Sequence, residues 1–202
     1  MPVEHVEVIV EEPSMEDFLR LVLPKVLGGT SFEVYPHQGK DELLQRLPDR
    51  FRGYASWLPS TYRIAVVVDR DDDDCTALKR RLDRMAREAG LSTRPRTAAQ
   101  PWAVVSRVAI EELEAWYFGD WEAVRSAYPR VDAKIPRKEK FRDPDAITGG
   151  TWEAFERIVQ NAGYHTGGLA KKTAAREIGT HIDPVRNRSR SFQALRGALA
   201  AL

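Results

Sequence analysis

A strand that is buried on both faces leads directly into a cluster of acids at "IAVVVDRDDDDC", residues 64–75. The apolar run has no polar alternation, which is typical of a parallel strand covered by helices on both sides. Asp69 stands at the carboxyl tip of this strand, and Asp71 points the same way if the chain stays extended. Crowded carboxylates repel one another and are costly to bury without a partner. Either solvent and a helix N-terminus or a bound cation must therefore offset their charge.

Strands and helices alternate from residue 3 to about residue 118. The apolar patterns predict strands at 3–12, 31–36, 62–68 and 101–110. Helices are predicted between them, the first capped by Ser14, the second over 40–58 with an interruption near Pro48, and the third from about Asp73 to Glu88. This alternation predicts an α/β fold with a mostly parallel sheet flanked by helices.

The remaining third of the chain has a different character. One or two helices are predicted after residue 110, and a basic loop with several prolines follows at 129–150. Three further helices are predicted at 151–162, 168–180 and 189–201. We therefore expect a core at 1–128 and, at 129–202, a basic loop and helical extension packed on that core.

Composition excludes several classes of protein. Hydrophobic residues make up 43% of the 202 residues and charged residues 30%, which is typical of a globular chain and not of a disordered one. A single cysteine, Cys75, excludes a disulfide framework within the chain and a cysteine-rich zinc site. There is no apolar stretch of membrane-spanning length, and the N-terminus is acidic instead of a basic leader. These features predict a cytoplasmic protein without a membrane segment.

The net charge of +1 conceals an asymmetry between the two parts. Residues 1–129 contain 17 Lys and Arg against 22 Asp and Glu, whereas residues 130–202 contain 14 against 8. This division is expected where a cation site and a surface that binds a polyanion share one protein, and a solvated basic face is the alternative.

Acids follow three of the predicted strands. Because the carboxyl ends of parallel strands meet at one edge of the sheet, these acids are expected to lie together. They are Glu11 and Glu12 after the first strand, Asp69 and Asp71 after the third, and Glu111, Glu112 and Glu114 after the fourth. Glu111 and Glu114 would share a helix face, while Asp72, Asp73 and Asp74 would lie in the first turn of a helix as caps. Such oxygen-only sets suit Mg²⁺ or Mn²⁺ and could activate water against a phosphodiester.

The order "VIVEEPS", "VVVDRDDDD", "IEELEAW" resembles the catalytic core of Toprim domains, which serve topoisomerases, primases and the overcoming-lysogenization-defect (OLD) nucleases. The whole chain resembles a bacterial domain-of-unknown-function family (number 4276) with a Toprim-like core. The phrases "EEPSMEDFLRLVLPK", "QGKDELL", "AIEELEAWYFGD", "FRDPDAI" and "RSRSF" carry this second resemblance.

The resemblance implies a metal-dependent nuclease in bacterial defence or DNA processing, with a separately encoded ATPase of the ABC or AAA type as a candidate partner. It implies catalytic roles for Glu11, Asp69, Asp71 and Glu114 as metal ligands, with Glu111 behind Glu114, and for Lys171, which would stabilise charge at the scissile phosphate. Nucleic acid, either DNA or RNA, would contact basic residues of the loop and the C-terminal helices, namely Lys138, Lys140, Arg142, Lys172, Arg188 and Arg190.

Two other functions remain open. The chain could be a non-catalytic partner subunit of an ATPase-containing complex, or a haloacid-dehalogenase-type phosphotransferase, whose Asp-x-Asp stands nearer the chain start than residue 69. The four histidines show no metal spacing and are interpreted as structural or surface residues. The aromatic side chains are interpreted as core, namely those of Trp102, Trp116, Tyr117, Phe118 and Trp121.

Overall fold

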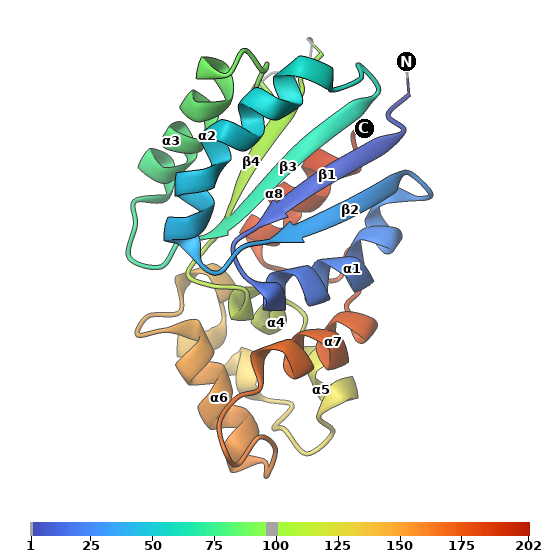
Figure 1. Ribbon diagram of the computed structural model, residues 1–202. Helices are drawn as coiled ribbons and strands as arrows, with labels where there is room; N and C mark the ends of the chain where they lie inside the picture. Colours follow the sequence, from blue (N-terminus) through green and yellow to red (C-terminus); the bar gives the residue numbers. More distant parts are fainter. Residues whose placement is uncertain (1, 96–100) are drawn as a thin grey trace.

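A single parallel sheet organises the molecule. The computed structural model describes residues 2–95 and 101–202, and in them four parallel strands pair in the order β2-β1-β3-β4 (Figure 1). The strands are β1 (His5–Val10), β2 (Ser31–Pro36), β3 (Tyr62–Asp69) and β4 (Val104–Ala109). The predicted α/β fold with a parallel sheet flanked by helices is confirmed, although the first and last strands are shorter than expected.

Helices connect the strands and then form most of the rest of the chain. The α-helices are α1 (Pro13–Leu27), α2 (Lys40–Trp57), α3 (Cys75–Glu88), α4 (Glu114–Gly119), α5 (Trp121–Ala127), α6 (Thr151–Asn161), α7 (Lys171–His181) and α8 (Arg190–Leu199). The predicted basic loop contains three short 3-10 turns, η1 (Ile135–Arg137), η2 (Glu139–Phe141) and η3 (Pro144–Ala146). None of the helices in the described residues is long and apolar enough to cross a bilayer.

The chain connections diverge between β1 and β3, and the region beyond the carboxyl ends of these two strands is here named the crevice. From β1 the chain passes through α1 to β2 on one side, whereas from β3 it passes through α3 to β4 on the other. Adjacent parallel strands whose connections diverge in this way leave a crevice beyond their carboxyl ends, where ligands of open α/β sheets bind. In Figure 1 these ends point toward the part of the molecule that contains α4 to α7.

The sheet is buried on both faces, as the apolar run of β3 predicts. Val66 and Val68 pack with α2 and α3, whereas Ala65 and Val67 belong to the larger core on the other face. This alternation is the two-residue period of a strand. Burying each such valine contributes roughly 1.5–3 kcal/mol, so the strand that carries Asp69 is firmly fixed.

The C-terminal part shares the larger core instead of enclosing one of its own. Phe155 and Ile178 belong to the same buried cluster as Val8 and Phe18 of the first part. Helices α1 and α7 pack closely, since a Cβ at Gly179 would lie 3.2 Å from Cδ1 of Leu21. The division at residue 128 remains a prediction.

Two details of the predicted helices are wrong. Helix α2 continues through Pro48, because the buried side chains on both sides of it, including Leu47 and Phe51, anchor the helix to the sheet despite the missing N–H. Helix α1 starts at Pro13 with Glu12 in the capping position, and the Ser14 hydroxyl donates to Oε2 of Glu12 at 3.1 Å instead of capping the helix.

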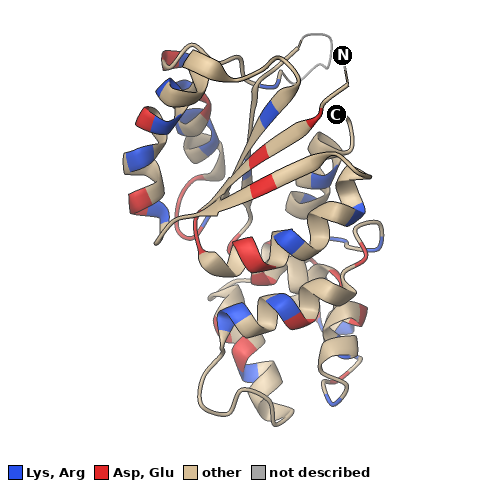
Figure 2. Ribbon diagram, turned by 45° about the vertical axis from the view of Figure 1, so that its right-hand side comes forward, with Lys and Arg blue, Asp and Glu red and all other residues tan. Residues whose placement is uncertain are grey.

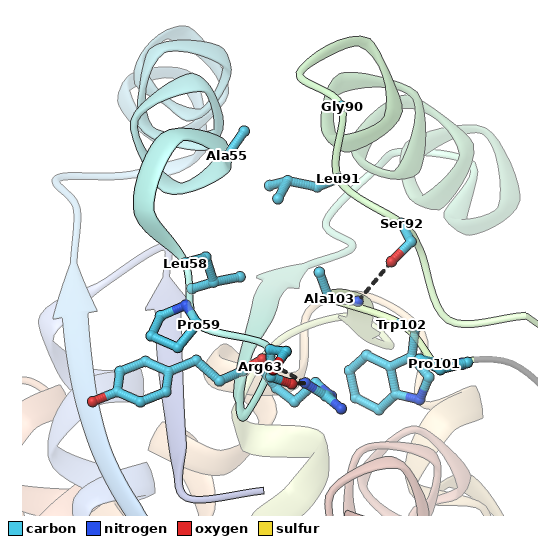
Figure 3. Close-up of a pocket in the computed structure, with 12 residues that line it drawn as sticks. Ala55, Leu58, Pro59, Arg63, Gly90, Leu91, Ser92, Pro101, Trp102 and Ala103 are labelled. Carbon is cyan, nitrogen blue, oxygen red and sulfur yellow. Dashed lines mark hydrogen bonds between the residues drawn. The ribbon is translucent and has the colours of Figure 1, made fainter. Parts of the chain in front are cut away.

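A pocket of 260 Å³ lies at the amino ends of β3 and β4, opposite the acidic crevice (Figure 3). Arg63 lines this pocket. Its guanidinium carbon lies 5.6 Å from the centre of the Trp102 ring, and the guanidinium group donates to the carbonyls of Ser60 and Tyr62, both at 2.7 Å. Arg63 thus supports the turn that enters β3. Trp102 lies at this pocket and is half-buried, whereas the other aromatic residues predicted to be core are buried.

Candidate metal centre

Three buried carboxylates meet at the crevice between β1 and β3. Glu11 directly follows β1, Asp69 ends β3, and Glu114 begins α4 after β4. They are only 6%, 6% and 3% exposed. Oε2 of Glu11 accepts a hydrogen bond from the backbone N–H of Asp69 at 3.0 Å, which joins the two strand ends directly. Parallel pairing of β1 with β3 sets this contact, since Val10 pairs with Val67.

Burial disfavours the charged forms of all three, and negative neighbours add to this effect. Burial, followed by the charge of Asp71, raises the pKa of Glu11 to about 7, although the Asp69 N–H and Lys40 oppose this. Burial also raises the pKa of Glu114 to about 7, against the charge of Lys171. The pKa of Asp69 lies well above its ordinary value, first because of burial and then because of Glu11 and Glu114. Asp69 therefore lies within electrostatic range of both Glu11 and Glu114.

This donor set fits a hard cation. Oδ1 of Asp69 is buried and has no hydrogen-bond partner among the described residues, so an oxygen at the carboxyl end of β3 is left without a donor. All the donors are carboxylate oxygens, which suit Mg²⁺ or Mn²⁺. As they stand, however, no three His, Cys, Asp or Glu side chains in the described residues meet the spacing of a formed metal site. A shared ion would therefore require side chains to turn toward one another.

Asp71 lies at the edge of this group and is already paired. The chain does not stay extended after β3, because Asp71 has a φ of 48° and so turns away from the strand direction. Its carboxylate lies 2.7 Å from Nζ of Lys40, the first residue of α2. The same ammonium group lies 2.8 Å from Oδ2 of Asp73 and donates to the carbonyl of Arg70 at 3.0 Å. Lys40 thus neutralises the outer part of the acid run.

Asp73 and Asp74 have different roles in the next turn, since Asp73 pairs with Lys40 and Asp74 caps α3. The prediction that Asp73 caps the following helix is wrong, because Asp74 is the cap and accepts from the Ala77 N–H at 2.6 Å. Helix α3 starts only at Cys75, which leaves Asp72 and Asp73 in the preceding turn.

Glu111 and Glu114 do not share a helix face, contrary to the sequence prediction. Helix α4 begins at Glu114, and Glu111 precedes it with a φ of 63° and forms an ion pair with Arg70. Glu112 has a third role, since its Oε2 accepts from the Thr151 hydroxyl and the Trp152 N–H, both at 2.9 Å. It therefore caps α6 and ties the crevice to the C-terminal part. A metal-binding role for Glu111 remains a prediction.

Of the two predicted lysines, Lys171 faces the crevice. Its Nζ lies 3.6 Å from Oε1 of Glu12, and the nearby charges of Glu114 and Glu12 raise its pKa although burial opposes them. Lys172 lies on the next position of α7 and pairs instead with Asp17 at 3.6 Å. A positive charge thus stands beside the buried carboxylates.

The predicted nucleic-acid residues lie in the C-terminal part, where Figure 2 shows both basic (blue) and acidic (red) positions along the lower helices. Lys138 pairs with Asp132 at 3.4 Å, and Arg190 pairs with Asp143 at 2.6 Å. Lys140 and Arg142 form no ion pair with a described acid, and neither does Arg188. These basic groups are exposed.

Sequence reasoning assigned Tyr117 to the core alone. Its hydroxyl is fully buried without a hydrogen-bond partner among the described residues, and burial followed by the charge of Glu114 raises its pKa well above the ordinary value. Tyr117 stands three residues after Glu114 in α4, and this helical spacing was the signal that could have placed it beside the site.

Comparison with known proteins places the chain in a family. No curated protein matches it. A solved structure of the C-terminal region of the Xanthomonas campestris pv. campestris OLD protein is 16% identical, with 98% of this chain and 95% of that chain covered and a TM-score of 0.41. A likeness this loose says nothing about activity. Residues 10–200 match the family described as "Domain of unknown function (DUF4276)", and because this span is nearly the whole chain, the protein belongs to that family.

Proposed function

We propose that the protein is a Mg²⁺- or Mn²⁺-dependent nuclease that hydrolyses phosphodiester bonds. The observation that carries this proposal is the convergence of Glu11, Asp69 and Glu114 at the crevice, where a buried oxygen of Asp69 has no partner among the described residues. The order of these acids along the chain also resembles that of Toprim catalytic cores.

Each group has a role in this proposal. Glu11, Asp69 and Glu114 would hold the cation, and Asp71 would join them if Lys40 released it. When bound, Mg²⁺ or Mn²⁺ supplies Lewis-acid activation of the phosphodiester and of water. The Lys171 ammonium would stabilise negative charge that develops on the phosphate, because it already lies beside the carboxylates on a fixed helix start.

The test is cleavage of plasmid DNA and of tRNA by the purified chain. We expect Mg²⁺ or Mn²⁺ to support cleavage and a chelator to abolish it. The Lys171→Met variant should cleave at least about tenfold more slowly than the Lys172→Met variant, since only Lys171 faces the crevice. Equal rates for the two variants would remove Lys171 from the mechanism, and cleavage that persists in chelator would refute metal dependence.

The basic loop gives a separate prediction about binding. Reversing the charge of Lys138, Lys140 and Arg142 should weaken nucleic-acid binding and reduce its dependence on salt, by a slope of roughly 0.9 for each phosphate that the loop no longer neutralises. Binding is measured at several salt concentrations in chelator, so that cleavage does not interfere. An unchanged salt slope would assign this loop to solubility alone.

A non-catalytic partner subunit is the second candidate. It is favoured by Lys40, which already neutralises Asp71 and Asp73 without any metal. In that case the acids would serve to position the chain on a separately encoded ATPase of the ABC or AAA type. Cleavage by the purified chain alone would exclude this candidate, whereas co-purification with such an ATPase and cleavage only in the complex would support it.

A further inference from the structure

Four arginines surround a pocket of 480 Å³ in the C-terminal part, formed by segments distant in sequence. They come from α5, from η1 and from the segment between α7 and α8, and they are Arg125, Arg137, Arg186 and Arg188. The lining also includes two acids, Asp120 and Glu122. None of the residues that hold the carboxylate crevice lines this pocket, so it is a separate feature of the molecule.

Asp120, one of the two acids that line the pocket, is buried and hydrogen-bonded within the protein. Asp120 is 1% exposed and holds Arg186 through two hydrogen bonds, from Nε to Oδ1 at 2.6 Å and from Nη2 to Oδ2 at 2.9 Å. It also accepts the backbone N–H of Asp183 at 2.8 Å. This two-pronged pair fixes the Arg186 guanidinium in one orientation.

The segment that carries Arg188 is equally fixed. The Arg188 N–H donates to the carbonyl of Gly119 at 2.9 Å, and the neighbouring Asn187 side chain donates to the carbonyl of Trp116 at 2.8 Å. Gly119 allows this approach, since a Cβ there would lie 2.1 Å from Oδ1 of Asn187. The backbone of this segment is therefore preorganised, and a ligand would not have to order it.

The other three arginines are not paired in the way that Arg186 is. Arg125, Arg137 and Arg188 are exposed and form no ion pair with any described acid. The chain has no acid in the segments outside the described residues. One fixed guanidinium group and three with free donors around a concave surface match the oxygens of a phosphate, which accept paired hydrogen bonds from arginine.

We propose that this arginine pocket binds a phosphate group of a nucleotide or of a nucleic-acid strand. The proposal rests on the proposed function only in taking a nucleic-acid strand as one source of that phosphate. Such a strand would then be gripped at a second point, apart from the carboxylate crevice. A free phosphorylated ligand would instead make the pocket a small-molecule site.

The experiment compares two double variants in chelator, where cleavage cannot occur. Arg125→Gln with Arg188→Gln removes two free guanidinium groups, and the control Arg80→Gln with Arg81→Gln removes two exposed arginines of α3. The probes are a fluorescein-labelled single-stranded DNA, followed by anisotropy, and ATP and pyrophosphate, followed by calorimetry. For whichever of these probes binds the wild type, the affinity of the pocket variant should be roughly tenfold weaker for each guanidinium group removed. The control variant should bind that probe as tightly as the wild type does.

The two sources of phosphate give different results. If the strand is the ligand, the pocket variant loses affinity for DNA, and ATP and pyrophosphate do not bind the wild type. If a free phosphorylated ligand binds, the variant loses affinity for ATP and pyrophosphate. Wild-type affinity of the pocket variant for all three probes would overturn the proposal.

A gain of affinity provides a check that misfolding cannot mimic. The Glu122 side chain is 74% exposed and lies 3.4 Å from Nη1 of Arg186, so it competes with an anion for that group. Glu122→Gln should strengthen binding of the same probe by a few-fold, and unchanged or weaker binding would contradict the proposal. If the pocket variants behave as expected while no cleavage is found with any metal, the nuclease proposal fails and the arginine pocket stands.

Discussion

Replacing Asp69 by Asn is expected to abolish metal-dependent cleavage and, at the same time, to stabilise the metal-free protein. Cleavage should fall by roughly a thousandfold, because the proposed metal would contribute several kcal/mol of charge stabilisation and Asp69 neighbours the other two proposed ligands, Glu11 and Glu114. The melting temperature in chelator should rise, because the variant removes one buried charge from beside Glu11 and Glu114.

The response to metal distinguishes this explanation from general stabilisation. Since a cation binds only the folded arrangement, Mg²⁺ or Mn²⁺ at a hundredfold excess over its Kd should stabilise the wild type by about 2.7 kcal/mol. For a chain of this size that is about 5–10 °C in melting temperature. The Asp69→Asn variant should lose most of this gain.

Asp74→Asn is the matched control, because it removes one charge from the same acid run but keeps a side chain that caps α3. It should retain both cleavage and the metal response. A wild-type melting curve that does not respond to either metal would mean that the carboxylates do not share a cation, and full activity of Asp69→Asn would refute the nuclease assignment.

The elements that carry the acids could be predicted because each rests on a strong periodic signal. The apolar run before Asp69 is typical of a strand covered on both faces, and parallel strands bring their carboxyl ends to one edge. Glu11 was therefore expected at the same edge of the sheet as Asp69. The contact between the Glu11 carboxylate and the Asp69 N–H is a direct consequence of this register.

The roles of the acids in the loops could not be predicted, because they depend on backbone conformations that leave no periodic pattern. Asp71 and Glu111 both adopt a positive φ, which reverses the direction in which each side chain points. Asp71 consequently pairs with Lys40 and Glu111 with Arg70. Such pairs join residues far apart in sequence, and only the packed structure determines them.

The C-terminal part shows the same limit at longer range. Glu112 looked like one more acid after the fourth strand, but it caps α6 through Thr151 and Trp152. Arg186 is one of many basic residues in this part of the sequence, but buried Asp120 fixes it as one wall of a pocket. The number of Lys and Arg in the sequence shows that this part is basic. Only the structure shows which arginines are held by an acid, as Arg186 is, and which are unpaired among the described residues.

The metal-free protein is expected to lose stability as the pH rises from about 4.5 to about 7. Burial raises the pKa of Glu11 and of Glu114 from 4.5 to about 7, so the folded state binds their protons more tightly than the unfolded state does. The stabilising effect is fully present below pH 4.5 and is lost as the pH passes through 7. At 1.36 kcal/mol per pKa unit, each group contributes at most about 3 kcal/mol to the free energy of unfolding.

Urea unfolding in chelator at about pH 5 and about pH 8 measures this change directly. The Glu11→Gln variant keeps an oxygen that accepts the Asp69 N–H but does not titrate, so its stability should change less with pH than that of the wild type. Glu88→Gln alters an exposed residue at the end of α3 and should leave the wild-type slope unchanged. Carboxyl groups whose pKa is lowered, such as Glu33 and Asp183, act below this pH window. Two results would contradict this prediction, namely equal stability of the wild type at both pH values and a Glu11→Gln variant with the wild-type slope. Either result would show that a positive partner already offsets the charge of Glu11. The crevice would then need no cation.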